Sequence, residues 1–435
     1  MKKERIKQLL NQKKIRAFPQ ETPLQVPRIV EQFLPDINQR QIVLLTGARQ
    51  TGKTTLVKKH YKDLRYINLD SIEDRDKINA VTSDAWGRSI GKAILDEAQK
   101  APSIFEKIKY AYDDQQLDFS VLLGSSQILL LKQIRESLAG RISLLELYPL
   151  MLCELIAKPD ESIKLPLFSQ LLTGKPINSI LNALPTILFQ EETPYRRAEQ
   201  RLLEEGGMPA LLNLNAGKFP DSWLRDYAYT YLERDLADLA RLNDLEPFRL
   251  FQKLAAARTA QLLSYSELAR DAGVSVDTAR RYLEYLKLSY QVILLQPYHK
   301  NITSSLIKMP KLYWLDLGIL RSISNNLGET TGHLFETYVV SECYKWIRST
   351  RDRAELYFYR TRHGLEADLI IELSQGIIGA EIKFRKEVYL QDAKALIAIR
   401  EKAENWLGGF IVYQGSEIKL LDKDIWAIPS WRLFS

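Results

Sequence analysis

The sequence has little cysteine and no long apolar run, and each absence excludes a class of protein. The 435 residues include two cysteines, Cys153 and Cys343, far apart and without partners at ligand spacing. This excludes a disulfide framework and a zinc site of the usual pattern. No run approaches the ~18 uninterrupted apolar residues of a membrane span, and the basic N-terminus lacks the apolar core of a signal peptide. We therefore expect a cytoplasmic protein that does not contact a membrane.

The composition describes a soluble globular chain of several domains. Hydrophobic residues make up 46% and charged residues 26% of the sequence, which is unlike a disordered protein. The length is sufficient for about two to four domains, each with its own core. The net charge of +7, from 61 basic and 54 acidic residues, is compatible with a polyanionic partner. It is equally compatible with an ordinary basic protein, because the distribution of charge matters more than its sum.

Residues 41–55, QIVLLTGARQTGKTT, carry the clearest motif. An apolar run rich in β-branched residues predicts a buried strand, and residues 47–54 then fit G-x-x-x-x-G-K-[ST]. Glycine allows backbone angles at which successive N–H groups surround a phosphate, and the following helix adds its positive N-terminus. Lys53 would reach the β- and γ-phosphates, and the Thr54 hydroxyl would coordinate Mg²⁺. The expected ATP-binding residues are Gly47, Ala48, Arg49, Gln50, Thr51, Gly52, Lys53, Thr54 and Thr55. A plain strand-to-helix turn is the alternative, and the apolar run and the helix-compatible TLVKKHYK around the motif disfavour it.

A second apolar strand, AILDEAQK at 93–100, ends in two carboxylates. At the tip of a parallel strand, Asp96 would hold Mg²⁺ through water and Glu97 would polarise the water that attacks the γ-phosphate. The alternative is a pair of acidic residues that caps the next helix. With the phosphate-binding loop upstream, the catalytic interpretation is favoured.

The middle of the chain predicts helices and then a helix-turn-helix. Residues 151–245 have the size of a helical lid, in which Trp223, Tyr227 and Leu232 would pack on a core. Residues 264–288 have helix-turn-helix spacing, with Gly273 at the turn and Ser275 capping the second helix.

The second helix of this motif carries Arg280, Arg281 and Lys287, and residues 292–316 can form the strands of a wing. Such a module binds DNA through its second helix in the major groove. It also serves as a protein contact or as an extension of a lid. The two uses stay open, because only the two arginines are obviously placed for phosphates.

The C-terminal region predicts a helix at 332–348, three strands, another helix and a further strand, the core order of PD-(D/E)XK nucleases. A turn centred at Ser374 and Gln375 places Asp368 opposite Glu381 and Glu366 opposite Lys383 on one face. The other face would be apolar, with Ala367, Leu369, Ile371, Ala380, Ile382 and Phe384.

Facing carboxylates repel each other, so this charged face favours a bound cation or full solvent exposure. In a nuclease, Asp368 and Glu381 hold Mg²⁺, and Lys383 stabilises the attacking water or the pentacovalent phosphate. Glu336, on the preceding helix, is the expected fourth acidic group. Nearby Arg360, Arg362 and His363 could grip a phosphate backbone. A solvated sheet face, or a nuclease fold kept only as a scaffold, is the alternative.

Taken together, these motifs resemble those of a large prokaryotic group of AAA-type ATPases with a C-terminal domain of unknown function that has a PD-(D/E)XK-like core. The resemblance runs from Gln41 to the C-terminus and rests on blocks that include GARQTGKTTL, ILDEAQ, LLGSSQ, SLAGRI, YLERDL, PKLYWLDLGIL, GHLFETYVVSE and YRTRHGLEADLIIE. It implies ATP binding, a Mg²⁺ requirement and a role that is linked to DNA, to mobile elements or to stress, three alternatives that the resemblance does not separate. Carried over residue by residue, it assigns Lys53, Thr54, Asp96 and Glu97 to the ATPase, and Asp368, Glu381 and Lys383 to the nuclease motif.

In ATPases of this type, the strand between the two motif strands usually ends in a polar sensor of the γ-phosphate. Residues 119–127 would be that strand, and Ser125 or Ser126 the sensor, unless they are simply turn residues. Arg141 stands where such proteins place an arginine finger, which reaches the nucleotide of a neighbouring subunit. Otherwise it is a charge at a helix C-terminus. The finger would imply a homo-oligomer.

The sequence thus predicts an α/β protein with a P-loop NTPase (AAA-type) parallel sheet, a helical lid, a winged helix and a restriction-endonuclease-like α/β domain. The expected boundaries are 1–155, 156–245, 246–312 and 313–435. The leading hypothesis is a Mg²⁺-dependent ATPase that acts on DNA with a nuclease-like domain. The alternative is a nucleotide-dependent switch that recognises DNA or a protein partner without cutting, and a third hypothesis is an ATPase directed only at protein.

Overall fold

The computed structural model describes residues 26–124, 138–159, 161–184, 189–213, 220–228, 230, 245–298, 309–361 and 364–435. Ser125, Ser126, Leu232, Arg362 and His363, singled out above, lie outside the described residues. Within the described ranges, no helix combines the length and the apolar character that a membrane crossing requires.

The N-terminal half forms a parallel sheet of five strands in the order β2-β3-β4-β1-β5. As predicted, the strand that begins at Phe119 lies between the two motif strands. The three central strands, β3, β4 and β1, are apolar and largely buried, as parallel strands covered on both faces require. They are β1 (Gln41–Thr46), β2 (Arg65–Asn68), β3 (Ala93–Asp96), β4 (Phe119–Gly124) and β5 (Ile142–Glu146).

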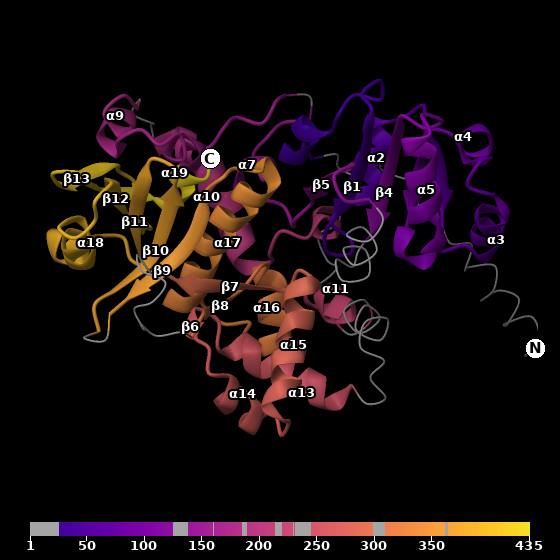
Figure 1. The fold of residues 1–435 in the computed structure, drawn as a ribbon. Helices are drawn as coiled ribbons and strands as arrows, with labels where there is room; N and C mark the ends of the chain where they lie inside the picture. Colours follow the sequence, from indigo (N-terminus) through magenta and orange to yellow (C-terminus); the bar gives the residue numbers. More distant parts are fainter. Residues whose placement is uncertain are drawn as a thin grey trace, which may run out of the picture.

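Short helices surround this sheet at the right of Figure 1. In α5, Ile104, Phe105 and Ile108 recur at helical spacing and are buried in one apolar cluster with strand residues. The helices are η1 (Ile29–Phe33), α2 (Lys53–His60), α3 (Ile72–Ala80), α4 (Trp86–Ser89), η2 (Ala98–Lys100) and α5 (Ser103–Asp113).

The helices of the expected lid pack mainly on the C-terminal elements. Helix α8 contacts α19 (Ser430–Leu433), and α9 contacts β12 (Trp406–Tyr413). Helix α10 contacts α16 (Leu317–Ser324), α17 (Gly332–Thr350) and α19. A contact with the phosphate-binding loop comes from α11, where the buried Tyr227 donates a hydrogen bond to the carbonyl of Arg49 at 3.0 Å. Trp223 stacks on Tyr227, so the predicted core role of both rings is confirmed. The helices are α7 (Leu152–Leu155), α8 (Leu167–Leu171), α9 (Ile177–Leu181), α10 (Phe189–Glu204), η3 (Pro209–Asn213) and α11 (Pro220–Tyr227).

The predicted helix pair at 264–288 is present. Gly273 turns the chain between the helices with φ +66°, and the Ser275 hydroxyl accepts a hydrogen bond from the Thr278 amide at 3.1 Å. The predicted turn and helix cap are therefore confirmed. The elements of this region are α13 (Glu246–Ala257), β6 (Gln261–Leu262), α14 (Tyr265–Asp271), α15 (Val276–Leu288), β7 (Val292–Pro297) and β8 (Lys311–Trp314).

A second sheet, of nine described strands, continues from this region into the C-terminal part, in the order β13-β14-β12-β11-β10-β9-β7-β8-β6. Strand β7 joins the two parts by pairing in parallel with β9 at Gln296↔Tyr357 and Pro297↔Phe358. Helix α17 packs in the apolar cluster on one face, and α18 in the cluster on the other. The remaining elements are α16 (Leu317–Ser324), α17 (Gly332–Thr350), β9 (Glu355–Arg360), β10 (Glu366–Leu373), β11 (Gly376–Lys383), η5 (Leu390–Ala393), α18 (Lys394–Arg400), β12 (Trp406–Tyr413), β13 (Lys419–Asp422), β14 (Ile425–Pro429) and α19 (Ser430–Leu433).

The hairpin β10–β11 has the predicted turn, and its ladder runs from Leu373↔Gly376 to Leu369↔Ala380. The predicted apolar face is wrong in one position. Ala367 belongs to the cluster around α18, whereas Leu369 and Ala380 belong to the cluster around α17. The reason is an irregularity in the β9–β10 pairing between Ala367 and Ile370, which shifts the alternation of side chains.

Helix α10 buries a carboxyl group where it meets α17 and α19. The Glu199 side chain is 6% exposed and lies against Tyr338 and Ser430. Burial raises the pKa of Glu199 from 4.5 to about 7, because the charged form loses its hydration.

This carboxyl group makes the stability of the fold depend on pH. The unfolded chain releases the proton near pH 4.5, whereas the folded protein keeps it to about pH 7. The free energy of unfolding therefore falls as the pH rises through this window.

Because Glu199→Gln is neutral throughout, we expect the free energy of unfolding of wild type to fall by roughly 1–3 kcal/mol more than that of the variant between pH 5 and pH 8. Urea unfolding at the two pH values measures this. Glu204→Gln, at an exposed position of the same helix, should behave like wild type. Equal pH dependence of wild type and Glu199→Gln would contradict the assignment.

Candidate functional site

The phosphate-binding loop follows β1 and turns sharply at Gly47, whose φ is +148°. A Cβ atom there would lie 2.1 Å from the carbonyl oxygen of Leu147, so only glycine fits. Lys53 begins α2 and bends back over the loop, donating hydrogen bonds to the carbonyls of Gly47 and Ala48, both at 2.8 Å. The Thr51 hydroxyl donates to the same Ala48 carbonyl at 2.9 Å. These bonds hold the ammonium group of Lys53 over the loop.

The two expected Mg²⁺ ligands come together from separate elements. The Thr54 hydroxyl, in the first turn of α2, donates a hydrogen bond to Asp96 Oδ2 at 2.7 Å. Tyr66, on β2, donates to the same oxygen at 2.8 Å, and the Glu97 amide donates to Asp96 Oδ1 at 2.9 Å. A hydroxyl and a carboxylate are the oxygen donors that a small hard cation prefers, so these residues fit Mg²⁺.

Glu97 has a left-handed backbone conformation, with φ +54°. This conformation costs a non-glycine residue about 1–2 kcal/mol, and such outliers are concentrated at functional sites. The Gln99 side-chain amide donates a hydrogen bond to the Glu97 carboxylate. Backbone and partner together fix the carboxylate beside Asp96.

Sequence analysis missed Arg28, which lies against the loop. Its guanidinium group donates hydrogen bonds to the carbonyls of Thr51, at 2.7 Å, and Tyr148, at 2.5 Å. It also pairs with the buried Glu154 at 3.1 Å, and Glu154 accepts a hydrogen bond from the Ile29 amide. Arg28 precedes the first strand and belongs to no motif, so no local signal marked it.

Tyr290 was also missed. It follows α15 with φ +60°, and its hydroxyl lies 2.7 Å from the hydroxyl of Thr46, the residue before Gly47. The same hydroxyl donates to Glu146 at the end of β5, at 3.0 Å. The region of α14 and α15 is thus joined directly to the strand that carries the phosphate-binding loop.

Arg141 lies apart from the loop. It directly precedes β5, which runs parallel to β1 with Ile42 opposite Ile142. Its guanidinium group pairs with Asp113 at 2.6 Å. Arg141 therefore lies at the end of the sheet where the parallel strands begin, whereas Gly47 lies at the end where they terminate. A finger role would require the nucleotide of another subunit.

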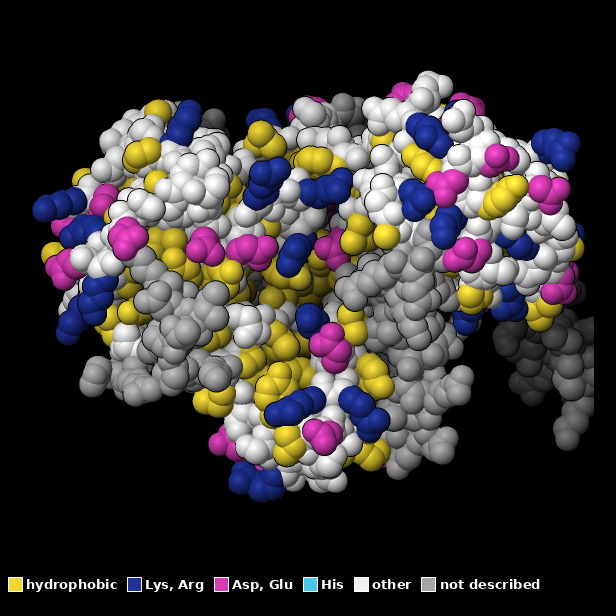
Figure 2. Space-filling view, in the orientation of Figure 1, with side chains coloured by type: hydrophobic (Ala, Val, Ile, Leu, Met, Phe, Trp, Pro, Cys, Tyr) yellow, Lys and Arg dark blue, Asp and Glu magenta, His cyan; other side chains and the backbone are white. Residues whose placement is uncertain are grey.

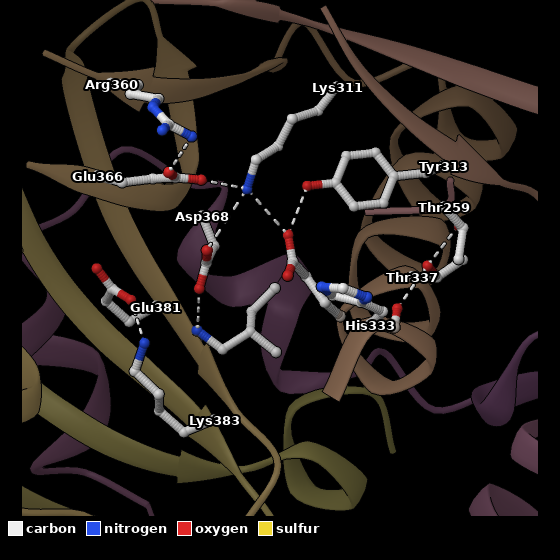
Figure 3. A network of polar contacts seen from close by, with 12 residues as sticks. Thr259, Lys311, Tyr313, His333, Thr337, Arg360, Glu366, Asp368, Glu381 and Lys383 are labelled. Atoms are coloured by element: carbon white, nitrogen blue, oxygen red, sulfur yellow. Dashed lines mark hydrogen bonds and ion pairs between the residues drawn. The ribbon is translucent and has the colours of Figure 1, made fainter. Parts of the chain in front are cut away.

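In the C-terminal region, three carboxylates surround one ammonium group (Figure 3). Lys311 Nζ, from β8, lies 2.5 Å from Glu366 Oε1, 3.2 Å from Glu336 Oε1 and 3.7 Å from Asp368 Oδ1. The Tyr313 hydroxyl, two residues along the same strand, donates to Glu336 at 2.7 Å. Burial alone would lower the pKa of Lys311, but the carboxylates outweigh it and raise the pKa.

The predicted cluster is brought together, with different pairings. Asp368 accepts a hydrogen bond from the Ile382 amide at 2.9 Å, and Lys383 pairs with its neighbour Glu381 at 2.7 Å. Glu366 pairs with Arg360 at 2.9 Å and with Lys311, so the expected pairing of Glu366 with Lys383 is wrong. The shift in strand alternation near Ala367 accounts for the change.

Two carboxyl groups of this cluster hold their protons unusually well. Burial, and then the charge of Asp368, raise the pKa of Glu381 and that of Glu336 above the usual value of a glutamate. The cation that lies among Glu336, Glu366 and Asp368 in this structure is the Lys311 ammonium group. Within the described ranges, no three carboxylate, histidine or cysteine side chains are placed to share a metal ion. As they stand, these residues do not fit the expected Mg²⁺.

The cluster opens into a cavity of about 410 Å³ whose lining includes Lys311, His333, Glu336, Arg360 and Glu366. His333, in the first turn of α17, Lys311 and Tyr313 were missed by sequence analysis. Residues 311–315 have the pattern of a strand, and nothing in their spacing links them to a hairpin some 60 residues later.

The outer surface does not have one sign of charge. On the face drawn in Figure 2, Lys and Arg side chains are interspersed with Asp and Glu side chains. On α15, Arg280 lies 3.9 Å from Asp277 and Lys287 lies 3.7 Å from Glu284, while Arg281 donates to the Thr278 hydroxyl. Charge alone therefore does not mark a nucleic-acid surface on this helix.

Three parts of the chain match known families. Residues 39–156 match the AAA domain, residues 196–330 a domain of unknown function, DUF8612, and residues 331–433 another domain of unknown function, DUF4143. The five-stranded sheet, the phosphate-binding loop and the Asp96–Glu97 pair lie within or overlap the first of these.

Similar proteins include the uncharacterised protein Rv2008c of Mycobacterium tuberculosis, which is 30% identical over 356 residues, covering 80% of this chain and 71% of that protein. The uncharacterised protein Mb2031c of Mycobacterium bovis matches to the same extent. The uncharacterised protein MJ1544 of Methanocaldococcus jannaschii is 22% identical over 348 residues, 76% of this chain and 72% of that protein. Among solved structures, the Walker-type ATPase PABY2304 of Pyrococcus abyssi is 16% identical and covers 66% of this chain and 91% of its own, with a TM-score of 0.40.

Proposed function

This chain belongs to the same family as the mycobacterial protein Rv2008c and carries an AAA domain, and we propose that it binds ATP and hydrolyses it with Mg²⁺. The observation that carries the proposal is the meeting of Thr54 and Asp96 beside a loop over which Lys53 is already held. These side chains come from different strands and helices, and P-loop ATPases use the same types of group at the same positions.

In the proposed reaction, the main-chain amides after β1 surround the β- and γ-phosphates, and Lys53 replaces its carbonyl contacts with phosphate oxygens. Thr54 and Asp96 would hold Mg²⁺, whose chemistry when bound is to neutralise the charge that develops on the phosphates. Glu97 orients the attacking water. Gln99 positions Glu97, and Tyr66 fixes Asp96.

The ATPase proposal predicts that Lys53→Ala abolishes turnover of ATP. The variant loses the only charge that we assign to the γ-phosphate from within the loop, so we expect kcat to fall by at least ~100-fold. Phosphate release by the purified full chain measures it. Lys59→Ala is the matched control, because Lys59 lies on the same helix and pairs with Glu31 at the surface. Turnover that survives in Lys53→Ala would show the assignment to be wrong.

We also propose that Arg141 acts in trans as an arginine finger. Its place before β5, away from the phosphate-binding loop of its own chain, is compatible with reaching the nucleotide of a second copy of the chain. Specific activity should then rise with protein concentration, and a value that stays flat on dilution would argue against it.

We also propose that the chain acts on DNA through α14 and α15. The order α13-β6-α14-α15-β7-β8 is that of a winged helix, and the cap at Ser275 and the turn at Gly273 support this interpretation. Arg280 is an exposed cation of α15 whose acidic neighbour is no closer than 3.9 Å, so it is available to a phosphate.

If α15 lies on DNA, binding should weaken with salt, and Arg280→Ala with Arg281→Ala should reduce the salt slope by about two. Fluorescence anisotropy with duplex DNA at several salt concentrations measures the slope. Arg75→Ala with Lys77→Ala removes two cations from α3 of the ATPase region and should leave the slope unchanged. An absence of salt-sensitive affinity would instead favour an ATPase directed at protein.

A nuclease-like core in the C-terminal region is supported by its order α17-β9-β10-β11-α18-β12. A specific observation favours the second candidate function, a nucleotide-dependent switch that binds without cutting. Lys311 lies 3.2 Å from Glu336 and 3.7 Å from Asp368, two of the three carboxylates that a nuclease would use for metal. We therefore expect no Mg²⁺-dependent cleavage of duplex, branched or single-stranded DNA. Cleavage by wild type that Asp368→Ala abolishes would restore the nuclease hypothesis.

A further inference from the structure

We propose that Lys311 is the resident cation of the C-terminal cluster and takes the place of a divalent metal, so that this site is complete without one. The inference goes beyond the ATPase proposal and does not depend on it, because it concerns side chains of the second sheet alone.

The first argument is position. Magnesium binds oxygen ligands at about 2.0–2.1 Å, and two-carboxylate sites hold it between their oxygens. Lys311 Nζ lies within 2.5–3.7 Å of one oxygen on each of Glu336, Glu366 and Asp368. The ammonium group therefore occupies the space on which these three carboxylates converge, as Figure 3 shows for Glu366 and Asp368.

The second argument is anchorage. Lys311 lies in β8, between β6 and β7, and pairs with Leu262 on one side and with Leu295 on the other. Its side chain is 5% exposed, and its ammonium group lies 5.7 Å from the centre of the Phe358 ring. A lysine placed in this way is part of the packed fold, unlike a surface side chain that happens to reach a neighbouring carboxylate.

The third argument is the balance of charge. Besides Lys311, two further cations serve the cluster: Lys383 pairs with Glu381, and Arg360 pairs with Glu366. Four carboxyl groups thus lie beside three cationic side chains, and Glu336, Glu366 and Glu381 each have a cationic partner within 3.2 Å. A metal ion would have to expel the Lys311 ammonium group and leave it buried without its partners, which is strongly unfavourable.

The chemical consequence is that the cluster lacks the metal ion that activates water in a metal-dependent nuclease. What it retains is a polar pocket with hydrogen-bond donors on Arg360 and Lys311. Such a pocket can position a partner or a phosphate group, but it cannot generate a metal-bound hydroxide.

The test is a titration of the full chain with Mn²⁺ alone, in which electron paramagnetic resonance measures the bound Mn²⁺. Thr54→Ala and Asp96→Asn are present in every protein, so that the ATP site does not contribute. We expect no stoichiometric Mn²⁺ site when Lys311 is present. Adding Lys311→Met should create one site with affinity at least ~10-fold higher, and further adding Asp368→Asn should abolish it.

Two matched variants separate position from charge. Lys383→Met removes another lysine of the same cluster but leaves Lys311 in place, and Lys311→Arg keeps a cation there, so neither should create a site. If Lys311→Met does not fold, Lys311→Gln, which keeps a polar side chain of similar reach, takes its place. The proposal is overturned if the Lys311 protein binds one Mn²⁺ that Asp368→Asn removes. It is also overturned if a folded Lys311→Met or Lys311→Gln protein gains no site.

Discussion

Parallel pairing of β1 with β4 and β5 is the constraint on which the ATPase region depends. Parallel strands end at a common edge, and ligands of such sheets bind there. The pairing places the turn at Gly47 and the carboxylates at the end of β3 at this edge, with β4 between them. Thr54 and Asp96 meet only because that spacing is fixed. Because the strands are buried on both faces, the edge cannot shift without disturbing two apolar clusters.

The features that could be predicted from the sequence are those whose signal is local. The phosphate-binding loop is one continuous motif, and the β10–β11 turn at Ser374 and Gln375 separates two neighbouring segments that each have the composition of a strand. The cap at Ser275 and the turn at Gly273 depend on residues within one or two turns of helix. In each case the chemistry that forms the structure lies within about ten residues, so one window of sequence contains it.

The features that could not be predicted involve partners far apart in the chain. Arg28, Tyr290 and Lys311 take their roles from contacts with residues that are separated from them by more than 20 positions. Their own surroundings in the sequence read as an approach to a strand, a helix end and an ordinary strand. The strand irregularity at Ala367 shows the same limit, since one change in pairing reversed the alternation on which the face of the hairpin was predicted.

The junction of β7 with β9 has a consequence for how this family is divided. The C-terminal unit that the comparison delimits, residues 331–433, includes Glu336, Glu366, Asp368 and Glu381, whereas Lys311 lies outside it. Excised at that boundary, the unit would keep its anions, lose their main counter-ion and expose the edge of β9 that β7 covers. The boundary drawn by sequence similarity cuts through a single electrostatic unit. A metal affinity measured on residues 331–433 alone would therefore reflect the loss of Lys311. Only a chain that includes Lys311 would give the affinity of the intact protein.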